Sequence, residues 1–241
     1  AISILVTVIK YNLYLSKKNE RTNVGLNVNN STYHLNIIIP VLREQTIIKS
    51  TLEYFESIVD KENTTIYVVA TAREEFEKKL ALLNIPSLAN DMIKNVDINQ
   101  IISKYNKLLP ISKLKELYSM REEYRFKEAE FEHLINQTVN KYPTTYEYLN
   151  SIDVVNSNEN IKVIRYEETN GIMAHQLNFA IDTILENINE SQNTFIDKNY
   201  CVIYNADSMP NENTFNEIEA KIIENNFPEV MQQYSLTLSN I

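Results

Sequence analysis

The residues best suited to chemistry lie in the segment 204–210, which reads YNADSMP. It ends the apolar run 200–204, a pattern typical of a strand buried in a parallel sheet. Open α/β sheets bind ligands at the carboxyl ends of their strands. A carboxylate there, Asp207, can hold a divalent metal and through it a diphosphate, because Mg²⁺ prefers one or two carboxylates plus phosphate oxygens. An Asp after a strand more often caps a helix or closes a turn, so this segment alone does not decide the function.

The first elements predicted after residue 34 are two strands and two helices in alternation. The run 35–41 (LNIIIPV) is short, apolar and rich in β-branched residues, which is typical of a buried strand. The run 65–70 (TIYVVA) has the same character, and a charged helix start follows it at Arg73. Between the strands we expect a helix with a buried stripe of Ile48, Leu52, Phe55 and Val59, flanked by Thr51 and Ile58. This order predicts a right-handed βαβ unit.

Residues 84–158 carry no strand signal and predict a helical insertion, with helices notably over 91–108 and 113–140. We expect the insertion to pack beside the sheet as a subdomain and to contribute no strand. Its expected work is acceptor handling or partner contact, because insertions on a scaffold tend to carry specificity.

The strand pattern resumes at 161–165 and again at 200–204, with further elements expected as a helix over 212–225 and a strand over 229–235. The helix between the first two of these strands should bury one face, made of Leu177, Ile181, Ile184 and Leu185. The predicted fold class is therefore α/β, with a mostly parallel open sheet flanked by helices.

The composition limits the partners. With 32 acidic and 23 basic residues among 241, the formal net charge is −9. Nucleic-acid binding is driven by clustered Lys and Arg, so this balance argues against a nucleic-acid partner and against electrostatic docking on an anionic membrane. The single cysteine, Cys201, cannot form an internal disulfide and is interpreted as a small buried hydrophobe.

The N-terminal segment 1–34 is expected to stand apart from the domain 35–241. Its apolar run 1–9 is far shorter than the ~20 residues that a spanning helix needs. Basic residues follow the run, as they often do on cytoplasmic flanks. The run is interpreted either as the stub of a membrane helix or as an amphipathic helix packed on the domain. Residues 19–34 are polar, rich in Asn, and typical of a linker.

Five segments, in order, resemble blocks of the family-2 glycosyltransferases. The family opens with an apolar strand, a Pro and an acidic residue, and its second strand ends in a loop that holds the nucleotide base. A Gly followed by a helix carrying Leu-Asn comes next, then an Asp-x-Asp motif with Ser and Pro, and then a strand containing Gln. The matching segments are 37–44 (IIIPVLRE), 68–74 (VVATARE), 170–178 (NGIMAHQLN), 205–210 (NADSMP) and 230–233 (VMQQ). The likeness spans residues 35–234 apart from the insertion.

The resemblance implies a nucleotide-diphospho-sugar transferase fold and a nucleoside diphosphate sugar as donor, with uridine the expected nucleoside. The metal, Mg²⁺ or Mn²⁺, would be held by Asp207 and would stabilise charge on the leaving diphosphate. The resemblance places the catalytic base in a later block, beyond residue 241, so the chain is expected to bind the donor without transferring sugar. The donor-binding residues that it implies are Pro40, Val41, Glu44, Thr71, Asn178, Asn205 and Asp207.

The acceptor is expected to be a saccharide or a lipid hydroxyl. The resemblance also implies work at the cytoplasmic face of a membrane, or in the cytoplasm, with membrane association through flanking helices.

The sequence departs from the family pattern at several positions. Asn205 replaces the first Asp of the motif, which keeps a hydrogen-bonding group but removes a charge beside the metal. Thr71 stands where an acidic residue is usual; it can bond a uracil edge or cap the next helix. Met173 replaces a basic residue that would offset diphosphate charge, and His175 or Arg165 is a candidate substitute. The alternative for His175 is an ordinary surface position.

Three functions are therefore compared. The first is an active glycosyltransferase. The second is a non-catalytic relative that serves as a binding or scaffolding module, which the departures and the large insertion favour. The third, a nucleotidyltransferase or another α/β enzyme on a similar sheet, is disfavoured because we would expect a Gly-rich basic loop for the triphosphate after the first strand, and residues 40–44 contain no Gly.

Overall fold

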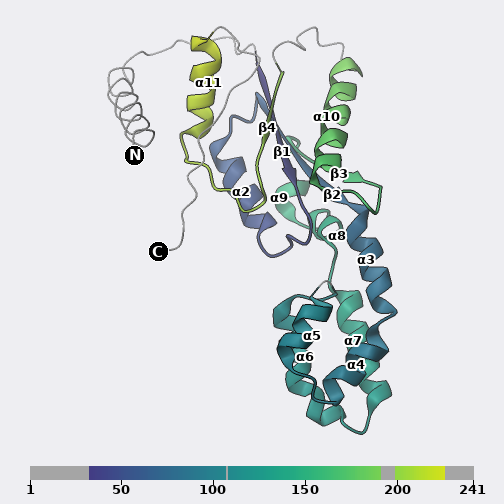
Figure 1. The fold of residues 1–241 in the computed structure, drawn as a ribbon. Helices are drawn as coiled ribbons and strands as arrows, with labels where there is room; N and C mark the ends of the chain where they lie inside the picture. Colours follow the sequence, from purple (N-terminus) through teal and green to yellow (C-terminus); the bar gives the residue numbers. More distant parts are fainter. Residues whose placement is uncertain (1–32, 107, 191–198, 226–241) are drawn as a thin grey trace, which may run out of the picture. The chain divides into compact units, whose positions relative to one another are not determined.

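The computed structural model describes residues 33–106, 108–190 and 199–225, except the side chains of 189 and 190 (Figure 1). These residues belong to one compact unit that begins at Tyr33. The segment 1–32 lies outside the described residues, and so does the strand expected over 229–235 with its Gln-containing block.

Four strands form one parallel sheet in the order β3-β2-β1-β4. β1 (His34–Pro40) pairs with β2 (Thr64–Thr71) on one side and with β4 (Asn199–Ile203) on the other, and β3 (Ile161–Tyr166) lies outside β2. The α/β fold predicted from the sequence is confirmed. The strand order reverses between β1 and β4, and ligands of open α/β sheets bind at such switch points.

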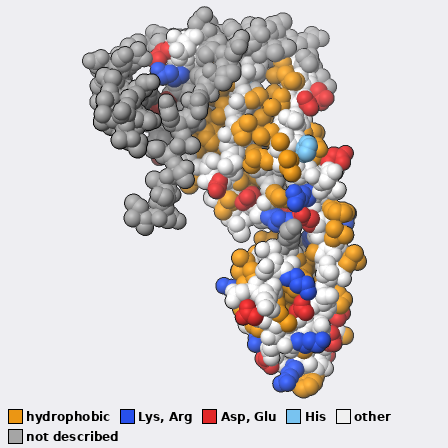
Figure 2. All heavy atoms as spheres, viewed as in Figure 1, with side chains coloured by type: hydrophobic (Ala, Val, Ile, Leu, Met, Phe, Trp, Pro, Cys, Tyr) orange, Lys and Arg blue, Asp and Glu red, His pale blue; other side chains and the backbone are white. Residues whose placement is uncertain are grey.

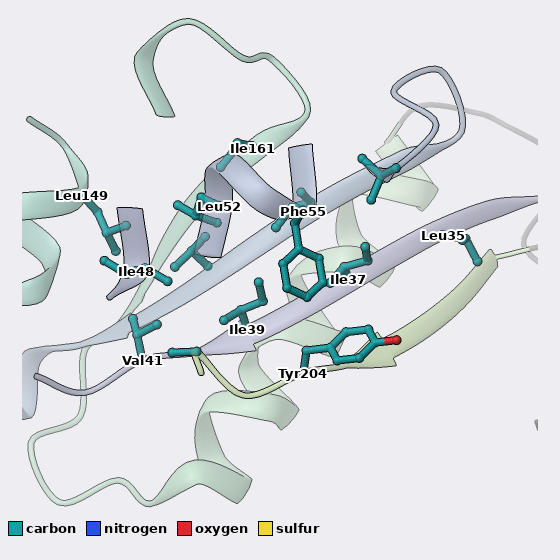
Figure 3. Packing of buried hydrophobic residues seen from close by; sticks show 14 of the residues in the cluster. Leu35, Ile37, Ile39, Val41, Ile48, Leu52, Phe55, Leu149, Ile161 and Tyr204 are labelled. Atoms are coloured by element: carbon teal, nitrogen blue, oxygen red, sulfur yellow. The ribbon is translucent and has the colours of Figure 1, made fainter. Parts of the chain in front are cut away.

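One face of the sheet is covered by α2 (Ile48–Ile58) and α11 (Thr214–Glu224). Figure 3 shows Phe55 of α2 beside Ile37 and Ile39 of β1, and all three side chains are fully buried. The stripe predicted for α2 is confirmed, because its buried residues are Ile48, Thr51, Leu52 and Phe55.

The other face is covered by α10 (Met173–Glu190), which contacts β1, β2 and β3. Its buried residues follow a spacing of four, Gln176, Ala180 and Ile184, and the last two pack against Ile38 and Val69. The prediction that Leu185 shares this face is wrong, because its side chain is 45% exposed.

The prediction that Cys201 is buried is also wrong, because it is exposed. Cys201 and Ile203 lie on the α10 side of β4, opposite Asn36 and Ile38 of β1. β4 is one of the two edge strands of the described sheet, and α10 lies over the other three strands. Figure 2 shows hydrophobic side chains gathered on this side of the molecule, over β4 and α10.

The insertion starts after α3 (Ala72–Leu82) and has its own hydrophobic core, in which Phe131 and Ile135 are fully buried. The described residues between 84 and 158, which are all but residue 107, contain no strand. The insertion therefore packs as a helical subdomain (Figure 1). Its helices are α4 (Ile85–Ile93), α5 (Ile98–Tyr105), α6 (Ile111–Met120), the short 3₁₀ helix η1 (Arg121–Tyr124) and α7 (Glu128–Lys141).

The long helices expected in the insertion are each interrupted, and the insertion is shorter than predicted. In 91–108 the break comes at Asn95, whose φ is 57°, and Asp97 then caps α5 by accepting from the Asn99 amide at 2.8 Å. In 113–140 the chain passes through η1 before α7 begins.

The last part of 84–158 packs against the sheet and not in the core of the insertion. It forms α8 (Thr145–Leu149) and α9 (Asp153–Asn156), and Leu149 and Ile152 pack in the core under α2. Among the described helices, none combines the length and the apolar character needed to cross a membrane.

Candidate functional site

The loop after β4 is held in place by α2. The Thr51 hydroxyl donates to the Ala206 carbonyl at 2.5 Å, and the Tyr54 hydroxyl donates to the Pro210 carbonyl at 2.5 Å. Thr51 and Tyr54 are three residues apart and therefore share one face of the helix. Beneath the loop, the Tyr204 ring lies 5.2 Å from that of Phe55, centroid to centroid. The helix that covers the sheet thus also positions the predicted motif.

Asp207 lies in a tight turn within this loop. The backbone amide of Asn205 donates to the Ser208 hydroxyl at 3.1 Å, and the backbone amide of Ser208 donates back to the backbone carbonyl of Asn205 at 3.0 Å. Ala206 is buried while Asn205 and Asp207 are exposed. The turn therefore exposes the Asp207 carboxylate, as a metal ligand requires, and the Asn205 side-chain amide, as a hydroxyl-binding group requires.

The loop after β1 carries Glu44 and is fixed by backbone hydrogen bonds. The Glu44 amide donates to the Thr145 hydroxyl at 3.1 Å, and the Glu44 carbonyl accepts from the Ile48 amide at the start of α2 at 2.9 Å. The preceding residue, Arg43, has a φ of 62°. A non-glycine residue in the left-handed region is uncommon, and such residues gather at functional sites.

Glu44 and Asp207 come together at the switch point. β1 and β4 are adjacent parallel strands, so the loops that follow them start at the same edge. Burial raises the pKa of the Glu44 carboxyl, and the negative charges of Asp207 and Glu74 raise it further. This repulsion would be relieved by a cation, and carboxylate oxygens suit Mg²⁺ or Mn²⁺.

Replacing Glu44 by Gln is expected to stabilise the protein at pH 7. Because the pKa of Glu44 is raised on folding, the native state binds more protons than the unfolded state at intermediate pH, and stability falls as the carboxyl ionises. Below about pH 3 the carboxyl is neutral in both states, so the difference should vanish. Thermal melts of wild type and Glu44→Gln at both pH values measure this effect.

The control for that comparison is Glu212→Gln, an exposed glutamate before α11. It should melt like wild type at both pH values. A Glu44→Gln variant that melts at or below the wild-type temperature at pH 7 would mean that the Glu44 charge is compensated.

The structure places Thr71 in the capping role rather than in an open loop. Its hydroxyl accepts from the Arg73 amide at 3.2 Å at the start of α3, and the residue is only 5% exposed. Pro40 ends β1, and the backbone of Val41 continues the ladder, because its amide donates to the Val69 carbonyl at 3.0 Å. Pro40, Val41 and Thr71 are all buried, so they support the ends of β1 and β2 from within the core.

The side chain that α10 brings to the strand ends is Gln176, which sequence reasoning did not single out. Its amide Nε2 donates to the Val41 carbonyl at 3.2 Å and to the Val69 carbonyl at 2.9 Å, which ties the ends of β1 and β2 together. Asn178 is exposed and lies two residues further, roughly 200° around the helix. The structure therefore does not bring Asn178 to the edge with Glu44 and Asp207.

The proposed substitutes for a basic residue at Met173 have other partners. Arg165 Nη2 lies 3.0 Å from Glu75 Oε2 and 3.5 Å from Glu167 Oε2. His175 is exposed, and its Nδ1 accepts from the Ile172 amide at 3.1 Å, so it supports the turn before α10. Neither side chain is committed to the edge between β1 and β4.

A pair of arginines that sequence reasoning missed lies at the ends of β1 and β2. Arg43 forms an ion pair with Glu77, and Arg73 Nε lies 3.1 Å from the other oxygen of the same carboxylate. Two guanidinium groups therefore share the Glu77 carboxylate beside the Glu44 loop, and the Glu74 carboxylate lies next to them. The pair of Arg73 and Glu77 could have been predicted from the sequence, because the two residues are four apart on a helix. The contact of Arg43 with Glu77 could not.

Gly171 lies directly against the Tyr166 ring. A Cβ atom at this position would clash with that ring, so a side chain there would have to displace it.

A hollow of about 490 Å³ lies elsewhere, on the insertion, and is lined by Tyr124, Ala129, Glu130, His133, Leu134 and Gln137. None of the candidate site residues lines it.

Comparison of the chain with protein-family models, with curated proteins and with solved structures gives no match. The function is therefore argued from the fold and from the chemistry of the strand-end edge.

Proposed function

We propose that this chain binds a nucleoside diphosphate sugar at the carboxyl edge of β1 and β4 and serves as the donor site of a glycosyltransferase. The observation that carries the proposal is the meeting of Glu44 and Asp207 at the switch point of a parallel sheet. The negative charge of Asp207 contributes to the raised pKa of Glu44, and two carboxylates at one edge are suited to a divalent cation, which in turn suits a diphosphate.

The residues divide the work of binding by their chemistry. Asp207, exposed in its turn, would hold Mg²⁺ or Mn²⁺, with Glu44 as the neighbouring carboxylate. The metal would stabilise negative charge on the leaving diphosphate. The side-chain amide of Asn205 would form a hydrogen bond with a ribose hydroxyl. Arg43 and Arg73 would offset diphosphate charge in place of the basic residue missing at Met173.

The acceptor hydroxyl, of a saccharide or a lipid, and the place of action at the cytoplasmic face of a membrane are parts of the same proposal. They rest on the resemblance alone.

The second candidate is a non-catalytic binding or scaffolding module on the same fold. It is favoured by Asn205 in place of an aspartate, by Met173 in place of a basic residue, and by the large helical insertion. Such a module would keep the sheet and the insertion but would bind no nucleotide through Asp207.

A thermal shift with UDP and Mn²⁺ separates the two candidates. A ligand at 100 times its dissociation constant stabilises the native state by about 2.7 kcal/mol. For a unit of this size that corresponds to a melting temperature about 5–10 °C higher. The rise should need both components, so UDP with EDTA and Mn²⁺ alone are the controls. A melting temperature that UDP and Mn²⁺ together leave unchanged would favour the scaffolding module.

A further inference from the structure

Glu74 is a buried carboxylate whose partners lie far away in the sequence. It is the third residue of α3 and is 8% exposed. Its Oε2 accepts from the Arg43 amide at 3.2 Å, and its Oε1 accepts from the Thr145 amide at 3.1 Å and from Gln45 Nε2 at 2.5 Å. One side chain thus joins the loop after β1 to the first residue of α8.

The local sequence would give Glu74 a different role. Thr71 and Glu74 have the spacing of a capping box, in which the glutamate bonds back to the helix start. Thr144 and Glu147 form such a box at α8, with both reciprocal bonds present. Glu74 instead reaches partners 31 and 71 residues away, which indicates a role in tertiary structure rather than in starting its own helix.

The same two segments are joined by two further hydrogen bonds, and a third ties α3 to residue 142. The Thr145 hydroxyl accepts from the Glu44 amide at 3.1 Å, and the Pro143 carbonyl accepts from Gln45 Nε2 at 3.0 Å. The Tyr142 carbonyl accepts from Lys78 Nζ at 2.8 Å. Residues 142–145 are where the chain returns from the insertion to the sheet. The loop that carries Glu44 is therefore attached directly to this return.

We propose that Glu74 is a positioning residue that couples the helical insertion, α4 to α7, to the donor site. Movement of the insertion shifts the return at 142–145, and Glu74 passes that shift to the loop that holds Glu44. Insertion and donor site then regulate each other, because coupling between two sites is reciprocal. The consequence for binding rests on the proposed function, whereas the mechanical link rests on the hydrogen bonds alone.

Glu74→Gln tests the link with little change of shape. The carboxylate accepts three N–H donors through two oxygens, whereas the amide offers one acceptor oxygen and turns a donor NH₂ toward donors. A buried donor left without its partner opens its segment more easily. Hydrogen exchange of peptides covering 41–47 and 142–147 should therefore accelerate about tenfold in both segments together.

The matched control is Glu147→Gln, which removes a carboxylate two residues beyond the return that belongs to a local capping box and lies 3.7 Å from Lys78 Nζ but has no bond to the loop after β1. It should accelerate exchange in 144–148 and leave 41–47 at the wild-type rate. If Glu74→Gln does not fold, Gln45→Met removes two of the bonds without altering the buried charge, and it should accelerate the same two segments to a smaller degree.

Binding gives the second readout. UDP with Mn²⁺ should slow exchange at 142–147 in wild type and should no longer do so in Glu74→Gln. An unchanged 41–47 segment in both Glu74→Gln and Gln45→Met would overturn the coupling, as would a Glu147→Gln variant that accelerates 41–47 equally. If Glu74→Gln opens both segments but wild type binds no UDP, the link stands and the proposed function fails.

Discussion

Replacing Phe55 by alanine is expected to lower the free energy of unfolding by about 3–5 kcal/mol. Phe55 is fully buried between α2 and β1, and its ring lies 5.2 Å from that of Tyr204 and 6.0 Å from that of Phe215, centroid to centroid (Figure 3). The substitution removes apolar contact with Tyr204, just after β4, and with Phe215 of α11 at once, and the cavity that it leaves is surrounded by rigid rings.

The measurement is a denaturant or thermal melt, in which Phe55→Ala should lower the melting temperature by about 6–20 °C. Phe126→Ala is the matched control, because the Phe126 side chain is 93% exposed and its loss should change stability by less than about 0.5 kcal/mol. Equal melting temperatures for the two variants would contradict the packing of this core.

The sheet and its main helices are predictable from the sequence because each is encoded locally. Strands of a parallel sheet are buried on both faces, so β1 and β2 appear as short continuous apolar runs. The stripe on α2 likewise follows from its helical period.

The features that the sequence did not predict either depend on neighbouring elements or carry a weak local signal. Cys201 lies in an apolar run, yet its exposure is decided by where α10 ends over the sheet, and no local pattern encodes that position. The break at Asn95 is a local feature, but it is hidden in a sequence where Asn is common in helices and loops alike.

The candidate site was predicted in part for a geometric reason. Glu44 and Asp207 follow different strands, and parallel strands bring their carboxyl ends to one edge, so their meeting follows once both strands are recognised. Gln176 and Glu74 could not be found this way. Their hydrogen bonds span 135 and 71 residues, and each replaces the role that its own segment suggested. The block around Gln176 pointed to Asn178, and the spacing after Thr71 pointed to a capping box.

Replacing Asp207 by alanine is expected to abolish metal-dependent nucleotide binding without loss of stability. Residues that merely support a metal ligand cost about 10–100-fold in affinity when they are changed, so removal of a ligand should cost at least about 100-fold. The fold should be preserved because Asp207 is exposed in a turn that Asn205 and Ser208 close between themselves, and because the loop is anchored by Thr51 and Tyr54.

Calorimetric titration with UDP in the presence of Mn²⁺ measures the loss, and a melt without ligand checks the fold. Asp182→Ala, an exposed aspartate on α10, is the control and should bind as wild type does. Asn205→Asp should tighten the metal dependence, because it adds a second negative charge to the same turn. Unchanged affinity in Asp207→Ala would remove Asp207 from the site, and with it the reason for placing a metal between β1 and β4.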